Sequence, residues 1–69
     1  MKENEVKMEK PICSLIGKDG NIFNLIGIAS KCLRSNGMVN EAIEMTTKVF
    51  EASSYEMALC IIGDYVEIV

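Results

Sequence analysis

The stretch GNIFNLIGIASKCLRSNG, residues 20–37, decides the fold of this chain because it predicts one long amphipathic helix. Its apolar residues recur at intervals of three and four, the spacing that places side chains on one face of an α-helix. Asn21 suits the N-cap, and Asn36-Gly37 supplies a left-handed stop. We therefore expect a helix from near Asn21 with one apolar stripe: Ile22, Leu25, Ile26, Ala29 and Leu33, widened by Ile28 and Cys32.

Gly27 is the exception inside this predicted helix. A glycine in a helix interior costs roughly 1 kcal/mol relative to alanine. We therefore expect another backbone to cross close to Gly27, and the third helix is the element that we predict there.

Two shorter helices are expected to fold back over the stripe. The second begins at about Asn40 as N-cap, and its predicted inner face is Ala42, Met45, Thr46, Val49 and Phe50. Residues 52–54 break it, and Ser53 with Glu56 forms an S-x-x-E capping box that opens the third helix. Helical spacing in the third helix is carried by Tyr55, Ala58, Leu59, Ile62, Tyr65 and Val66. Short loops imply antiparallel neighbours.

The two ends of the chain carry short apolar runs that suit strands. Residues 12–16, ICSLI, lie between a proline and a Gly/Asp/Asn turn, and residues 66–69 read VEIV. We predict an α+β fold that is mostly α: a three-helix bundle with a short pairing of the N- and C-terminal strands. The alternative is an extended N-terminal segment on the bundle, with the third helix running to the end. Residues 1–10 are expected to be a mobile charged tail, and residues 11–69 a single small helical domain.

Size and charge limit what such a domain can do. A core of this size supplies only ~3–5 kcal/mol of net stability, so a partner or a second copy would help a 69-residue chain. The net charge is −3, which argues against nucleic acid as the partner, because basic residues supply most of that affinity. Residues 1–35 carry six basic and four acidic side chains, whereas residues 36–69 carry one basic and six acidic side chains. This asymmetry could help the two halves of the chain dock on each other, or let two copies associate with opposite charges facing. An ordinary solvated surface is the competing interpretation.

The cysteine pattern predicts a reduced, cytoplasmic protein. Cys13, Cys32 and Cys60 are odd in number and widely spaced, and the chain has no histidine, which rules out the mixed zinc patterns. We expect these thiols to act as small core hydrophobes, and we expect no metal and no cofactor. No run approaches the ~20 apolar residues that a membrane span requires, so no membrane partner is expected.

The loop before the first helix is a candidate anion site. Gly17, Lys18, Gly20 and Asn21 put backbone donors and one positive charge ahead of a helix N-terminus, an arrangement that can hold an anion. The sequence does not complete a phosphate-binding fingerprint, because Asp19 follows Gly17-Lys18. A structural turn and cap is the competing interpretation.

The sequence lacks the residues expected of an enzyme active site or of a DNA-binding helix. Without histidine, no serine or cysteine has an obvious activating partner, so we expect no enzyme. A helix–loop–helix arrangement around Gly37 resembles a DNA-reading unit, but its second helix would be acidic. A nucleic-acid-associated accessory protein that uses Lys18, Lys31 and Arg34 remains the alternative function.

Methionine and phenylalanine supply the candidate interaction surface. Met38, Met45, Phe50 and Met57 could form a soft apolar patch, and such surfaces adapt to partners. We therefore predict a non-enzymatic protein-interaction module that binds a protein partner or itself.

The segments PICSLIGKDGNIFNLIGIASKCLRSNGM, EAIEM and SYEMALCIIGDYVEI together resemble a family of short uncharacterised bacterial proteins. These occur in anaerobic Gram-positive bacteria, often within integrated mobile elements such as conjugative transposons. The resemblance covers nearly all of the chain from Pro11 to Ile68 and implies a small cytoplasmic accessory protein of a mobile element. It implies no activity and no functional residues.

Overall fold

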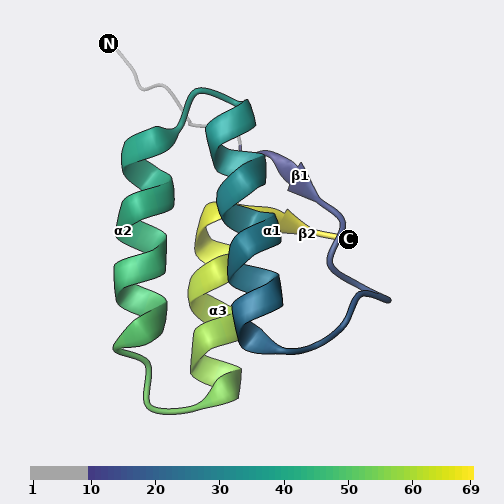
Figure 1. Cartoon of the computed structure of the whole chain (residues 1–69), viewed down its shortest axis with the longest axis vertical. Helices are drawn as coiled ribbons and strands as arrows, with labels where there is room; N and C mark the ends of the chain where they lie inside the picture. Colours follow the sequence, from purple (N-terminus) through teal and green to yellow (C-terminus); the bar gives the residue numbers. More distant parts are fainter. Residues whose placement is uncertain (1–9) are drawn as a thin grey trace, which may run out of the picture.

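A computed structural model describes residues 10–69 as three helices with one pair of very short strands (Figure 1). The elements follow in the order β1 (Ile12–Cys13), α1 (Ile22–Ser35), α2 (Val39–Phe50), α3 (Tyr55–Tyr65) and β2 (Glu67–Ile68). Consecutive helices run in opposite directions, and each packs against the other two. The mostly-α α+β three-helix fold expected from the sequence is confirmed. Of the predicted tail at residues 1–10, residues 1–9 lie outside the described residues, and the Lys10 ammonium donates a hydrogen bond of 2.8 Å to the carbonyl of Gly63.

α1 begins and ends where its sequence predicts. The Asn21 side chain accepts a hydrogen bond of 2.8 Å from the backbone N–H of Phe23, as an N-cap residue does. At the other end Gly37 has a φ of 75°, and its N–H donates to the carbonyl of Arg34. Four residues of the expected stripe are buried, together with Ser30: Leu25, Ile26, Ala29 and Leu33. Ile22, the first residue of the expected stripe, is partly buried against the core.

The start of α2 differs from the prediction. Its N-cap is Met38, which makes no capping bond with its side chain, so Asn40 as N-cap was wrong. The Met38 N–H donates to the carbonyl of Leu33 at 2.8 Å, and together with the Gly37 bond this completes a Schellman motif. The motif turns the chain so tightly that α2 starts at Val39.

The start of α3 is displaced by one residue from the predicted capping box. Ser54, not Ser53, is the N-cap, and its hydroxyl accepts from the N–H of Met57 at 3.1 Å. Ser53 instead places its hydroxyl 3.7 Å from the sulfur of Met57. The capping box predicted from Ser53 and Glu56 was therefore wrong. The N-cap is the last extended residue before the helix, and the loop from α2 places Ser54 at that position.

The ends of the chain pair as parallel strands, which confirms the predicted pairing. Ile12 lies opposite Glu67, and Cys13 lies opposite Ile68. The contact continues beyond the ladder, because the carbonyl of Val69 accepts from both N–H groups of residues 15 and 16, at 2.8 and 2.9 Å. α3 ends at Tyr65, so the alternative of a helix running to the end is excluded.

The core lies between the three helices and the strand pair. Its largest fully buried side chains come from β1, from each of the three helices and from the residue after α3: Cys13, Leu33, Met45, Ile62 and Val66. The predicted crossing at Gly27 is wrong. This residue is exposed, and a Cβ built on it would meet nothing within 4 Å, so neither α3 nor any other described element lies there.

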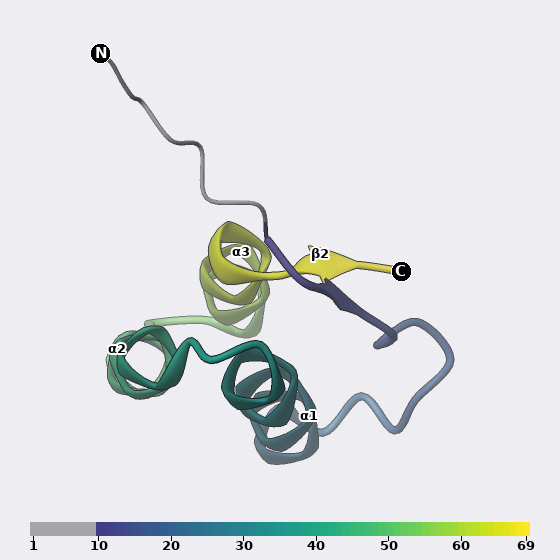
Figure 2. The ribbon, with the colours of Figure 1, turned by 90° about the horizontal axis from the view of Figure 1, so that it is seen from above.

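The strand pair covers only one side of the bundle. Viewed along the helices in Figure 2, β2 lies beside α3, while α2 lies on the far side of the bundle from the strands. β1 contacts α1, and β2 contacts α3. Within residues 10–69 no element packs over the outer side shared by α1 and α2. No helix in this part of the chain is long and apolar enough to cross a membrane.

Candidate interaction surface

The side shared by α1 and α2 carries a row of exposed apolar side chains, which we call the outer face. α2 contributes Val39, Ile43 and Phe50, which are 50%, 57% and 62% exposed. α1 contributes Phe23, which is 66% exposed. Single exposed apolar residues are ordinary on protein surfaces, but a contiguous set marks an interaction site.

Helix geometry explains why these residues share one face. The spacings from Val39 to Ile43 and from Ile43 to Phe50 are four and seven residues, which return to nearly the same direction on a helix. The buried row of α2 points about a quarter turn away from them: Ala42, Met45 and Val49. α2 is therefore apolar on two faces, and the core uses only one of them.

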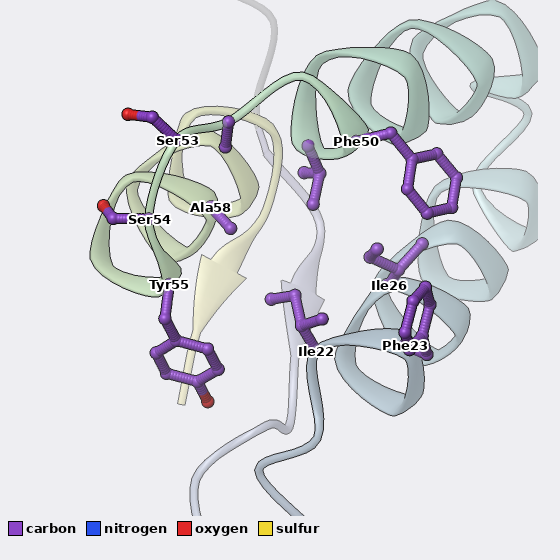
Figure 3. A pocket seen from close by; sticks show the side chains of 10 residues that line it. Ile22, Phe23, Ile26, Phe50, Ser53, Ser54, Tyr55 and Ala58 are labelled. Carbon is purple, nitrogen blue, oxygen red and sulfur yellow. The ribbon is translucent and has the colours of Figure 1, made fainter.

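The two phenylalanines join the helices at one end of the outer face. The ring centroids of Phe23 and Phe50 lie 6.0 Å apart, and the rings are tilted by 43°. Figure 3 shows both rings beside each other at the edge of the bundle, one from α1 and one from α2. The prediction that Phe50 lies on the inner face of α2 was wrong. Phe50 follows the buried Val49 by one residue, so its side chain points about 100° away from that of Val49.

Charged residues border the outer face with opposite signs. By helical spacing, Lys31 lies on the flank of α1 away from α2, whereas Glu44 and Glu51 lie on the flank of α2 away from α1. Lys48 lies farther round α2, with its ammonium 5.6 Å from the Tyr65 ring of α3 and 3.8 Å from the Glu44 carboxylate. The Tyr65 hydroxyl, followed by the Glu44 charge, raises the pKa of Lys48.

An apolar pocket of about 340 Å³ opens at the same end of the bundle, between the start of α1 and the loop from α2 to α3 (Figure 3). Its walls include Ile26, Tyr55 and Ala58 beside the two phenylalanines. The hydroxyl of Ser54, which also borders the pocket, is occupied as the cap of α3. Among residues 10–69, no carboxylate or thiol lines the pocket, so its chemistry suits the binding of an apolar group.

The predicted methionine patch is not assembled by the fold. Met45 is completely buried and belongs to the core, and Met38 is half-buried against that core. Met38 and Phe50 stand at opposite ends of α2, and Met57 lies on α3. Phe50 is the one member that contributes to the outer face.

Two backbone N–H groups of the predicted anion loop already have partners within the chain. The N–H of Asn21 donates to the Asp19 carboxylate at 3.1 Å, and the Asn21 side chain caps the N–H of Phe23. Gly17 has a φ of 89°, and the backbone N–H of Lys18 closes the turn by donating to the carbonyl of Leu15. An external anion at the Asn21 N–H would have to displace Asp19, which already places a negative charge at the positive end of α1.

The three basic residues of the nucleic-acid alternative are spread along α1. Lys18 precedes the helix, whereas Lys31 and Arg34 lie in its last turns, about 14–18 Å beyond its first residue at 1.5 Å per residue. Such spacing does not make a compact basic patch.

The cysteines divide into a pair and a single residue. Cys13 on β1 is completely buried, Cys32 on α1 is half-buried, and their sulfur atoms lie 2.8 Å apart. Cys60 on α3 is exposed, so the expectation of three core thiols was wrong for this residue.

Sequence reasoning missed the outer face although a signal for it was present. The predicted stripe of α1 does not include Phe23, and the predicted inner face of α2 includes neither Val39 nor Ile43. The second apolar row of α2, at 39, 43 and 50, could have been found by asking which apolar residues the inner face leaves unused.

Comparison with protein-family models, curated proteins and solved structures gives no match for this chain. The resemblance to proteins of mobile elements therefore stays a prediction.

Proposed function

We propose that this protein is a non-enzymatic interaction module whose outer face binds a second copy of the same chain. The observation that carries the proposal is the exposed apolar row on two neighbouring helices: Phe23, Val39, Ile43 and Phe50. A small domain gains stability when such a surface is buried, at about 25 cal/mol for each Å² of apolar area removed from water.

Gly27 supports an occupant that approaches α1 closely. By helical spacing it lies on the outer face, one turn beyond Phe23. Glycine in mid-helix is unfavourable, and no described part of this chain comes within 4 Å of the space that a side chain would fill. A helix from outside the chain could use that space, as helices pack closely over small residues.

The bordering charges favour a second copy in one orientation. If the twofold axis runs parallel to the helices, α1 of one copy faces α2 of the other, and the Lys31 flank meets the Glu44 flank. The contact between Phe23 and Phe50 fixes a common height on the two antiparallel helices. Measured from this height in the same direction, Lys31 lies about 12 Å along α1 and Glu44 about 9 Å along α2, so the two charges are at similar heights. A twofold axis perpendicular to the helices would instead place α1 against α1 of the second copy. The Lys31 side chains of the two copies would then lie near each other, and their like charges would repel.

Sedimentation equilibrium over a range of concentrations tests the proposal. We expect the native chain to associate as a dimer and the double variant Phe23→Ser, Phe50→Ser to remain a monomer with unchanged helix content. Ile16→Ser is the matched control, because Ile16 is 74% exposed but lies on the loop after β1. A native chain that stays monomeric at the highest soluble concentration, or a control that weakens association as strongly, contradicts the proposal.

Charge reversal tests the orientation. Lys31→Glu alone and Glu44→Lys alone are each expected to weaken the dimer, since each puts like charges together. The double reversal is expected to recover most of the affinity, and this recovery should shrink at high salt. Additive losses in the double variant would reject the proposed pairing while leaving the Phe23 and Phe50 test standing.

The cellular setting of this module rests on the resemblance alone. We propose a cytoplasmic accessory protein of a mobile element. Purifying the chain from a cell that carries such an element, at its native level, would show whether the dimer acts alone or with another component.

A further inference from the structure

We propose that Cys13 and Cys32 form a redox-active dithiol, which a low-molecular-weight disulfide oxidises to an intramolecular disulfide. This inference does not depend on the proposed self-association. By helical spacing Cys32 lies on the side of α1 that faces β1, away from the outer face.

The geometry places the two sulfur atoms in reach of a bond. The Cys32 thiol donates toward the sulfur of Cys13 at 2.8 Å, so the two sulfur atoms need to approach by only about 0.75 Å to reach the length of an S–S bond. The two residues come from different elements and are 19 positions apart in the chain. Their contact is therefore a product of the fold, made where β1 lies against α1.

Burial assigns different roles to the two thiols. Cys32 is half-buried and can be reached by a small disulfide, whereas Cys13 is completely enclosed. Burial, together with the neighbouring Cys32 thiol, raises the pKa of Cys13 to about 12, so this thiol keeps its proton in neutral solution. Cys32 is thus the residue that attacks the small disulfide, and Cys13 is the resolving residue.

The oxidation proceeds as two thiol–disulfide exchanges. The Cys32 thiolate attacks one sulfur of the small disulfide, whose S–S bond breaks and releases one thiolate. The Cys13 sulfur then attacks the Cys32 sulfur of the mixed disulfide, and its proton passes to the second departing thiolate. Two protein thiols are oxidised by two electrons, and one small disulfide is reduced to two thiols.

The product would tether the strand pair to the first helix. Cys13 lies in β1, and its carbonyl accepts the N–H of Val69 after β2. A cross-link that closes a loop of about 20 residues is expected to raise the folding equilibrium constant on the order of 100-fold. Oxidation would therefore stabilise the joined ends of the chain against α1.

Mapping of the thiols in the full chain tests the proposal. The reduced protein is equilibrated in glutathione buffers of increasing oxidised fraction, quenched with acid, alkylated under denaturing conditions and digested with trypsin. Cleavage after Lys18, Lys31 and Lys48 puts the three cysteines on separate peptides. We expect a cross-linked pair that contains Cys13 and Cys32, with Cys60 carrying glutathione only.

Two variants serve as controls. Cys60→Ser should form the cross-link unchanged, and its oxidised form should unfold at a clearly higher urea concentration than its reduced form. Cys32→Ser should leave Cys13 unmodified at every buffer composition. Glutathione retained on Cys32 while Cys13 stays reduced, a dominant cross-link to Cys60, or equal unfolding midpoints in both redox states would each overturn the proposal.

Discussion

The hydroxyl of Tyr55 donates a hydrogen bond of 2.6 Å to the backbone carbonyl of Gly20, 35 residues earlier in the chain. Tyr55 is the first residue of α3, and Gly20 closes the turn that precedes α1. The bond therefore fastens the starts of two parallel helices to each other. It also leaves little room at residue 20, because a Cβ there would lie 3.3 Å from the same hydroxyl oxygen.

Replacing this hydroxyl tests how much the bond contributes. Tyr55→Phe is expected to lower the free energy of unfolding by about 1 kcal/mol, the usual net contribution of one hydrogen bond. Urea denaturation followed by circular dichroism measures the change. Gly20→Ala should also destabilise the native chain, because Cβ and the hydroxyl compete for space, but should cost less in the Tyr55→Phe background. Strictly additive effects of the two substitutions would show that the hydroxyl is not the neighbour that matters.

Ser30 is buried in α1, and its hydroxyl has no hydrogen-bond partner in the described structure. An unpaired buried hydroxyl is unfavourable, and alanine is the better helix former. Ser30→Ala should therefore raise the free energy of unfolding by about 1 kcal/mol. Ser35→Ala, at the exposed last residue of α1, is the control for helix propensity alone. A loss of stability in Ser30→Ala would mean that the hydroxyl is paired after all.

Two glycines should respond in opposite directions to alanine. At Gly27 a Cβ meets nothing within 4 Å, so Gly27→Ala should stabilise the monomer by about 1 kcal/mol. At Gly37, whose φ is 75°, alanine should destabilise by about the same amount because an L side chain is strained there. Unfolding is best measured at low protein concentration, where a dimer would dissociate. Equal effects at both positions would contradict the assigned backbone geometry.

The pKa of Cys13 predicts a loss of stability in alkaline solution. Burial raises this pKa from 9.0 to about 12 in the folded chain. Below pH 9 the thiol is protonated in both states, so its stabilising effect is complete. Between pH 9 and 12 only the unfolded chain releases the proton, and the free energy of unfolding should fall by about 1.4 kcal/mol per pH unit from this group.

Cys13→Ala separates this contribution from the tyrosines and lysines that titrate in the same range. The variant should be less stable at pH 7, because a buried side chain is shortened, yet its stability should fall less steeply above pH 9. Denaturation curves from pH 7 to 11 for both chains provide the comparison. Parallel curves would show that Cys13 ionises equally easily in the folded and unfolded states.

The fold was largely predictable because its signals are local. The stripe of α1, its Asn21 cap and its Gly37 stop all lie within one stretch of sequence, and each is confirmed. The caps of α2 and α3 were misplaced by one or two residues. The start of α2 depends on the geometry of the preceding turn, because the Schellman turn after α1 brings Val39 directly into the next helix.

The surfaces were less predictable because they depend on which of several apolar rows the core uses. Met45 and Phe50 were assigned to one patch, but one is completely buried and the other is exposed. Periodicity shows that α2 has two apolar faces, and only the positions of α1 and α3 decide which one becomes the inside.

The sequence by itself determined the number of helices, the span of the first one and the strand character of both ends, since these follow from spacing and turn chemistry. Only the tertiary structure decided what lies beside what. It left the space over Gly27 empty, turned Phe23 and Phe50 outward as neighbours, and brought Cys13 to Cys32. The physical reason is that these contacts join residues from separate elements, whose relative placement comes from packing the whole core.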